Sequence, residues 1–159
     1  MNPMDLRNDI VVFDMDGVLT QYNFEELGVK VLPEQEWIRE NMQRDMYKFV
    51  KKTSLFDELI NNMNPMDMYV LSTAFTSFEQ NNKINLIEEQ YGNIREDNII
   101  FVAKDEYKAI ILQELRDIYD KSNKQNKRII LIEDTARIMI SVEELKDNRI
   151  KCYLISDFI

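Results

Sequence analysis

Residues 9–20 have the sequence DIVVFDMDGVLT, and they carry the strongest indication of fold in the chain. The four-residue apolar run IVVF leads directly into two carboxylates, Asp14 and Asp16, and then into Gly17. A short continuous apolar run is typical of a strand that is buried on both faces of a parallel sheet. In open α/β sheets, ligands bind beyond the carboxyl ends of the strands. The segment therefore predicts a buried first strand that delivers two acidic side chains to a binding site.

Apolar runs of similar length recur along the chain and alternate with segments of helical periodicity. Together with the first, the expected strands lie at residues 9–14, 68–72, 98–102, 128–132 and 150–155. Between them, apolar residues recur at intervals of three and four, which favours helices. The expected helices cover residues 34–52, 55–62, 77–91, 106–121 and 136–147. Alternating strands and helices predict βαβ units, so the expected class is α/β with a doubly wound parallel sheet.

Two details of these helices follow from local signals. Ser54 suits the N-cap of the helix over 55–62, because its hydroxyl can accept a hydrogen bond from the first turn. The helix over 106–121 is expected to face inward with Ile110, Ile111, Leu115 and Ile118.

The length of 159 residues predicts a single domain over residues 1–159. Residues 15–67 separate the first two strands, which is too long for a single crossover. We therefore expect a small, largely helical cap inserted at about 21–52, near the active edge of the sheet. A cap of this size leaves the site open, which favours loose recognition of the leaving group.

Composition excludes several chemistries. The chain has no His and one Cys, so no Ser-His-Asp triad, no His-ligated zinc and no internal disulfide can form. Its 29 acidic and 20 basic residues give a net charge of −9, which argues against long nucleic acids and suits a divalent cation held by carboxylates. No apolar run approaches the roughly 18 residues of a transmembrane helix, and no secretory signal is evident. We expect a cytoplasmic protein that does not contact membranes.

Polar residues follow four of the expected strands and should meet at one edge of the sheet. They are Asp14, Asp16 and Gly17 after the first strand, Ser72 and Thr73 at the second, Lys104 and Lys108 after the third, and Glu133 and Asp134 at the fourth. This set suits phosphoryl transfer, which depends on positioning and charge neutralisation. Lysine and a magnesium ion on carboxylate oxygens would offset the charge of the phosphate.

Each group has a chemical task in such a reaction. Asp14 can attack phosphorus and form an aspartyl-phosphate, while Asp16 can protonate the leaving oxygen and later activate water. Ser72 or Thr73 can donate a hydrogen bond to the phosphoryl group. Taken alone, each residue also has a simpler interpretation: Asp134 could merely cap the following helix, and a lysine is more often a solvated surface residue.

Four segments resemble, in order, the four motifs of the haloacid dehalogenase superfamily of aspartate-nucleophile phosphohydrolases. They are DMDGVLT, YVLST, AKDEYKAIILQEL and IILIEDTARIMISVEEL. The resemblance implies a Rossmann-like core with strand order 5-4-1-2-3, dependence on Mg²⁺, and Asp14 as nucleophile with Asp16 as acid and base. It also implies that Asp16 binds the metal through its backbone carbonyl.

The resemblance leaves two assignments open. The family's spacing favours Lys108, which precedes Asp134 by 26 residues, over Lys104 as the lysine of the third motif. The fourth motif has Glu-Asp where Asp-Asp or Gly-Asp is usual, so Glu133 would bind the metal either directly or through water.

The sequence thus predicts a magnesium-dependent phosphohydrolase that acts on small phosphomonoesters, either nucleotides or sugar phosphates. Nucleoside monophosphates are slightly favoured, with broad specificity and low affinity. A non-hydrolytic phospho-acceptor module and a phosphotransferase or mutase are the alternatives, and the oligomeric state is not predicted. The predicted catalytic residues are Asp14, Asp16, Ser72 and Lys108; Gly17, Thr73 and Lys104 are predicted to bind substrate, and Asp14, Asp16, Glu133 and Asp134 to bind metal.

Overall fold

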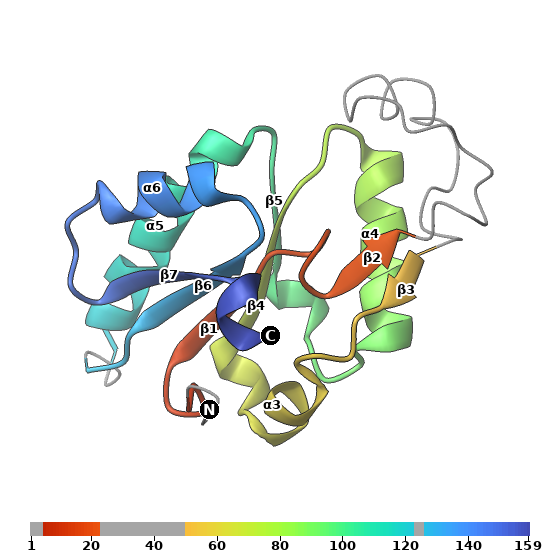
Figure 1. The fold of residues 1–159 in the computed structure, drawn as a ribbon, viewed down its shortest axis with the longest axis horizontal. Helices are drawn as coiled ribbons and strands as arrows, with labels where there is room; N and C mark the ends of the chain where they lie inside the picture. The colour runs from red at the N-terminus through yellow and green to blue at the C-terminus, as the bar shows by residue number, and fades with distance from the viewer. Residues whose placement is uncertain (1–4, 23–49, 123–125) are drawn as a thin grey trace.

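Five parallel strands form the main sheet of the protein. The structure is a computed structural model, and it describes residues 5–22, 50–122 and 126–159. The strands are β1 (Ile10–Phe13), β4 (Met68–Thr73), β5 (Ile99–Val102), β6 (Ile129–Glu133) and β7 (Ile150–Leu154). They lie in the order β5-β4-β1-β6-β7, with β1 in the centre (Figure 1). Counted along the chain within this sheet alone, the order read from β7 is 5-4-1-2-3. The α/β class and the parallel sheet are confirmed.

Helices cover both faces of the sheet, as a doubly wound fold requires. One face packs against α3 (Asp57–Asn62) and α4 (Ser77–Gln90), and the other against α5 (Lys108–Asp120) and α6 (Ala136–Glu143). Short 3₁₀ turns precede β4, β5 and α5, namely η2 (Pro65–Asp67), η3 (Glu96–Asn98) and η4 (Asp105–Tyr107), and a further one, η5 (Ile155–Phe158), follows β7.

The central strand β1 explains why its sequence is continuously apolar. Val11 and Phe13 belong to the apolar cluster under α3 and α4, whereas Ile10 and Val12 belong to the cluster under α5 and α6. All four side chains are fully buried. Because side chains alternate along a strand, burial on both faces leaves no position for a polar residue until the strand ends at Asp14.

A second, two-stranded antiparallel sheet follows β1. It pairs β2 (Thr20–Tyr22) with β3 (Val50–Lys52). The expected helix over 34–52 is therefore wrong at its C-terminal end, since residues 50–52 form a strand. Residues 23–49 lie outside the described residues, and with them the predicted helical cap. The prediction of one domain with a cap at about 21–52 stays a prediction.

Two local expectations are corrected. Ser54 does not cap α3: it has a positive φ of 61°, and the helix begins at Asp57 with no side-chain bond at its N-cap. In α5, Ile110 and Ile118 are 50% and 63% exposed. Leu115 is buried as expected, and the rest of the buried stripe of α5 runs through Lys108, Leu112 and Tyr119. This stripe directs the lysine of the first turn toward the sheet.

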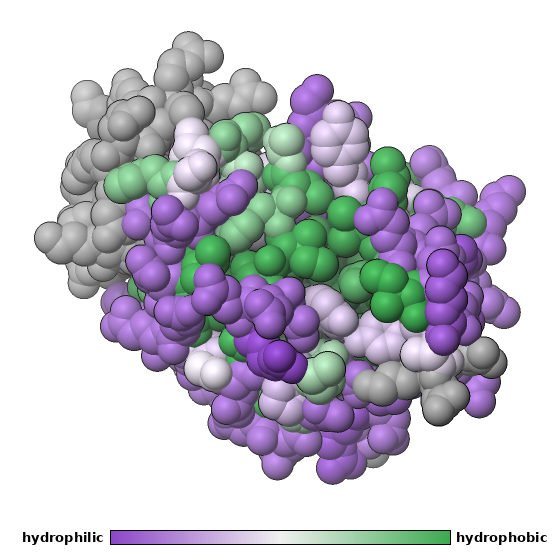
Figure 2. All heavy atoms as spheres, turned by 180° about the vertical axis from the view of Figure 1, so that it is seen from behind, coloured by the Kyte–Doolittle hydropathy of each residue, from purple (hydrophilic) through white to green (hydrophobic). Residues whose placement is uncertain are grey.

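The surface mixes apolar and charged side chains. On the face opposite to that of Figure 1, apolar side chains gather in the middle and are surrounded by hydrophilic ones (Figure 2). Among the described residues, no helix is long and apolar enough to cross a membrane. Burial raises the pKa of the Cys152 thiol to about 12, so this partly buried side chain behaves as a small apolar group.

Candidate active site

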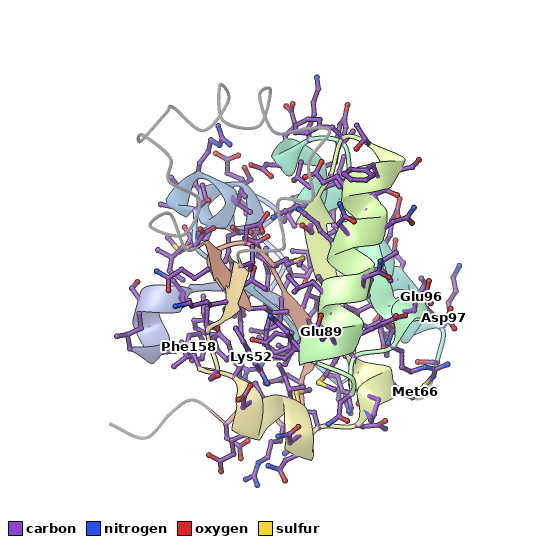
Figure 3. The ribbon with its side chains drawn as sticks, turned by 90° about the vertical axis from the view of Figure 1, so that its right-hand side faces the viewer. Lys52, Met66, Glu89, Glu96, Asp97 and Phe158 are labelled. Atoms are coloured by element: carbon purple, nitrogen blue, oxygen red, sulfur yellow. The ribbon has the colours of Figure 1, made fainter. Side chains whose placement is uncertain are left out.

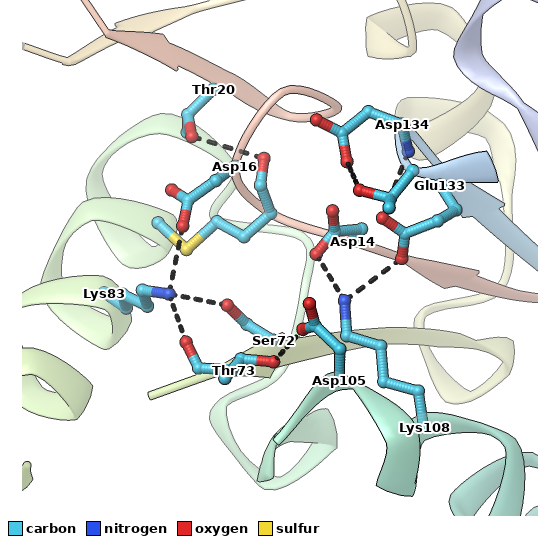
Figure 4. A network of polar contacts seen from close by, with 12 residues as sticks. Asp14, Asp16, Thr20, Ser72, Thr73, Lys83, Asp105, Lys108, Glu133 and Asp134 are labelled. Atoms are coloured by element: carbon cyan, nitrogen blue, oxygen red, sulfur yellow. Dashed lines mark hydrogen bonds and ion pairs between the residues drawn. The ribbon is translucent and has the colours of Figure 1, made fainter. Parts of the chain in front are cut away.

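Most of the predicted functional residues meet where β1, β4 and β6 end, beside the first turn of α5, whereas Lys104 is exposed (Figure 4). The four segments were expected to converge because the carboxyl ends of parallel strands lie at one edge of the sheet. The side chains in Figure 4 fall into two groups, one around Lys108 and one around Lys83, with Asp14 in the first and Asp16 in the second.

Lys108 holds the carboxylates of two different strands. Its Nζ donates to Asp14 Oδ1 at 2.9 Å and to Glu133 Oε2 at 3.0 Å, and all three side chains are buried. Burial alone would lower the pKa of Lys108, but the charges of Asp14 and Glu133 raise it. Burial raises the pKa of both carboxyl groups, and the ammonium opposes that rise. Of the two candidate lysines, Lys108 is the one placed against Asp14, whereas Lys104 is exposed.

Three carboxylates come close enough to share a cation. Asp14, Glu133 and Asp134 each offer an oxygen within 4.8 Å of the others. Glu133 is fixed by Lys108 and by the backbone N–H of Asp134, which donates to Oε1 at 3.1 Å. Asp134 is exposed, and its Oδ1 accepts a bond from the Thr135 hydroxyl at 3.1 Å. α6 has no side-chain bond at its N-cap, so helix capping does not account for Asp134.

Charge and donor type fit a hard divalent cation at this place. When ionised, the three carboxylates carry three negative charges against the single positive charge of Lys108, which leaves two in excess. Oxygen donors are those that Mg²⁺ prefers, and Asp134 faces solvent, from which the ion could retain waters.

Gly17 allows the loop after β1 to approach Asp134. Its φ is +82°, a region that L side chains rarely adopt, and its N–H donates to the carbonyl of Thr20 at 2.8 Å. A Cβ at this position would lie 2.2 Å from Asp134 Oδ2. Gly17 therefore serves the backbone geometry of the loop, and its role in substrate binding stays a prediction.

Gly17→Ala is expected to destabilise the fold and to weaken magnesium binding. The positive φ and the close approach to Asp134 together should cost about 1–3 kcal/mol. The free energy of unfolding in urea and a magnesium titration measure the two effects. Gly92→Ala is the matched control, since its Cβ would meet only Glu88 O at 3.6 Å, an ordinary contact. Equal effects of the two substitutions would contradict the role given to Gly17.

The loop after β1 is anchored from outside. The Thr53 hydroxyl donates to the carbonyl of Val18 at 2.7 Å, and Tyr91 Oη donates to the carbonyl of Leu19 at 2.5 Å. Lys52, labelled in Figure 3, places its ammonium 4.6 Å from the centre of the Tyr91 ring. Residues that directly follow β3 and α4 thus fix the segment that carries Asp16.

The two hydroxyls of β4 are engaged differently. Ser72 Oγ is buried and accepts a hydrogen bond from Lys83 Nζ at 2.7 Å. Thr73 Oγ1 donates to Asp105 Oδ1 at 2.5 Å, and Asp105 in turn accepts from Arg137 at 3.3 Å. Because the hydrogen of Thr73 is already used, Ser72 is the hydroxyl better placed to donate to a phosphoryl oxygen.

Lys83 is a site residue that the sequence analysis missed. It is 1% exposed, and its Nζ contacts Asp16 Oδ2, Ser72 Oγ and the carbonyl of Thr73. The signal that could have found it is helical spacing, since Lys83 stands three and four residues before the buried Leu86 and Ile87. A lysine on the inward stripe of a helix faces the sheet rather than solvent.

Comparisons with known proteins concern the fold. No protein-family model matches the sequence, and no curated protein matches it either. Among solved structures, one match is described as a haloacid dehalogenase-like hydrolase from Burkholderia xenovorans, with 15% identity, a TM-score of 0.49 and coverage of 91% of this chain and 83% of that one. Another is the HAD domain of the effector protein Lem4 from Legionella pneumophila, as an inactive mutant, with 15% identity, a TM-score of 0.47 and coverage of 92% and 84%.

The class of the chain follows from its own architecture. The parallel sheet has β1 at its centre, and the four motif-like segments deliver their polar residues to one edge. The chain is therefore an α/β protein with a doubly wound parallel sheet, and the DMDG turn after its first strand carries two of the acidic residues at that edge.

Proposed function

We propose that the chain is a magnesium-dependent phosphohydrolase that acts on phosphomonoesters through an aspartate nucleophile. The observation that supports this most is that two aspartates only two residues apart differ in burial and in the lysine with which they pair. Asp14 is buried and pairs with Lys108, whereas Asp16 is 38% exposed and pairs with Lys83. This difference supports assigning attack to Asp14 and proton transfer to Asp16, the two tasks that a two-step hydrolysis requires.

In the first step, a carboxylate oxygen of Asp14 bonds to phosphorus and the bond from phosphorus to the leaving oxygen breaks. Asp16 gives its proton to that oxygen. In the second step, Asp16 takes a proton from water, whose oxygen bonds to phosphorus, and the bond to Asp14 breaks. Lys108 holds Oδ1 of Asp14, which leaves Oδ2 to attack. Ser72 donates to the transferred group.

Asp14, Glu133 and Asp134 would hold the magnesium ion, together with the backbone carbonyl of Asp16. When bound, the ion neutralises charge on the phosphoryl oxygens and so permits an anionic nucleophile to approach. Lys108 also reduces the negative charge of the site, because its ammonium offsets the charges of Asp14 and Glu133.

Asp134→Ala is expected to weaken magnesium binding more than Glu133→Ala does. Asp134 is exposed and free to reach an ion, whereas both oxygens of Glu133 already accept hydrogen bonds from Lys108 and from the Asp134 backbone. Magnesium titrations followed by calorimetry compare the two variants, with Asp97→Ala on the exposed η3 turn as the control. The reverse order would make Glu133 the direct ligand.

The proposed activity is tested by measuring phosphate release from nucleotides, sugar phosphates and amino-acid phosphates, with magnesium and with a chelator. We expect magnesium-dependent release from several small substrates, nucleoside monophosphates among them. The charge of −9 makes long polynucleotides poor substrates. Absence of release from every phosphomonoester would contradict hydrolysis and favour a phospho-acceptor that keeps its phosphoryl group.

A further inference from the structure

A buried lysine on α4 joins the proton-transfer group to the phosphate-binding hydroxyl. The Nζ atom of Lys83 lies 3.1 Å from Asp16 Oδ2, 2.7 Å from Ser72 Oγ and 2.8 Å from the Thr73 carbonyl oxygen (Figure 4). An ammonium group has three N–H donors and no acceptor. The three donors meet three protein acceptors, so the geometry gives Lys83 a role in arranging its neighbours.

The effect on Asp16 is to distinguish its two oxygens. Oδ2 is held by Lys83, while Oδ1 is buried and has no hydrogen-bond partner within the described part of the chain. A buried carboxylate oxygen without a partner is costly, so it is expected where a ligand or water completes it. Lys83 thereby holds Oδ2 and leaves Oδ1 as the oxygen with capacity for a further hydrogen bond.

The effect on Ser72 is to direct its hydrogen. Because Ser72 Oγ accepts the bond from Lys83, its own hydrogen must point elsewhere, and among the described residues no group accepts it. The hydroxyl is therefore prepared to donate. One ammonium group sets the orientation of both side chains that meet the substrate from this side.

The start of α4 keeps Lys83 in place. Thr76 accepts a bond from the Glu79 backbone N–H at 3.1 Å, and Glu79 Oε2 accepts one from the Phe75 backbone N–H at 2.9 Å. The other oxygen, Oε1, lies 3.6 Å from Lys83 Nζ one helical turn away. These contacts tie the helix, the lysine and the end of β4 into one unit.

We propose that Lys83 is a positioning residue that fixes Asp16 and Ser72 for proton transfer and phosphate binding. The proposal rests on the proposed function, in which Asp16 is the acid and base. It adds a second lysine to the site, with a task distinct from that of Lys108, which contacts Asp14 and Glu133 instead.

The test compares Lys83→Met, Asp16→Asn and the double variant, with Lys151→Met on the exposed side of β7 as control. Steady-state rates are measured on a nitrophenyl phosphate and on an alkyl phosphate. The nitrophenyl group leaves without much protonation, whereas the alkyl group depends on it.

Circular dichroism and melting temperature check folding, and crystal structures of wild type and Lys83→Met show the side chains of Asp16 and Ser72. If Lys83→Met does not fold, Lys83→Gln, which keeps two donors, takes its place.

We expect Lys83→Met to lower kcat on the alkyl phosphate by about 100-fold, the lower range for general acid catalysis, and to lower it less on the nitrophenyl phosphate. Lys83→Gln is expected to lower kcat less, and again to lower it more on the alkyl phosphate than on the nitrophenyl phosphate. In the Asp16→Asn background, the loss on the alkyl substrate should largely disappear, because coupled residues are not additive. Equal losses on both substrates, or the same loss with and without Asp16, would overturn the proposal.

The crystal structures separate this proposal from the proposed function. If the wild-type protein hydrolyses no phosphomonoester, the proposed function fails. The positioning role of Lys83 is then tested by the crystal structures alone. Asp16 and Ser72 turned away from their wild-type rotamers in Lys83→Met would support the positioning role. Unchanged rotamers would overturn it.

Discussion

Asp14→Asn is expected to lower phosphate release by on the order of 10⁴-fold or more, the loss typical of removing a nucleophile. The amide has no anionic oxygen to attack phosphorus, and it is a poor ligand for magnesium. The change is nearly isosteric and keeps an oxygen that can accept the bond from Lys108. Phosphate release under saturating substrate and magnesium measures the effect.

The fold is expected to survive this substitution. With Asp14 neutral, Lys108 still pairs with Glu133, one positive charge against one negative charge. The melting temperature should therefore not fall markedly, which separates loss of chemistry from loss of structure. Retention of more than a small fraction of activity by a folded Asp14→Asn protein would exclude the covalent mechanism.

Lys108→Ala is expected to be severe for stability as well as for activity. It would leave Asp14 and Glu133 buried side by side with no cation between them, and removing one partner of a buried ion pair costs about 3–5 kcal/mol. Lys104→Ala, on the exposed residue before η4, should change the free energy of unfolding by no more than about 0.5 kcal/mol. Urea unfolding of both variants without magnesium gives the comparison.

Activity gives a second comparison of the two lysines. Lys108→Ala should cost far more phosphate release than Lys104→Ala, because only Lys108 contacts the predicted nucleophile. If Lys104→Ala were the inactive variant while Lys108→Ala stayed active, the assignment of the third motif would be wrong by one helical turn.

The core of the fold could be predicted because its sequence signals are local and strong. The run IVVF before Asp14 is short, continuously apolar and rich in β-branched residues, which together favour a strand buried on both faces. The convergence of Asp14, Lys108 and Glu133 followed from topology, since the ends of parallel strands share an edge.

Other features depend on tertiary contacts that local patterns do not specify. In α5, the adjacent Ile110, Ile111 and Leu112 allow more than one apolar stripe, and packing selects the one that includes Leu112 and leaves Ile110 exposed. The strand at Val50–Lys52 is only three residues long and is defined by its pairing with β2. The helical spacing of apolar residues over 34–52 therefore favoured a helix at this place.

Lys83 was missed for a related reason. Its helix α4 is largely polar, so a lysine in it is expected at the surface. Burial of a lysine is expected only where a carboxylate pairs with it. That carboxylate, Asp16, lies 67 residues earlier in the chain, so only the folded structure joins them.

The central claim, that Asp14 carries the phosphoryl group, is tested most directly by trapping the intermediate. The protein is incubated with magnesium and a phosphomonoester that it hydrolyses, and the reaction is then quenched in acid. Treatment with borohydride reduces an acyl phosphate to an alcohol. Peptide mass spectrometry should then find homoserine at position 14, in an amount that depends on substrate and is lost in Asp14→Asn. Phosphate release with unmodified Asp14, or a modified residue elsewhere, would contradict the account.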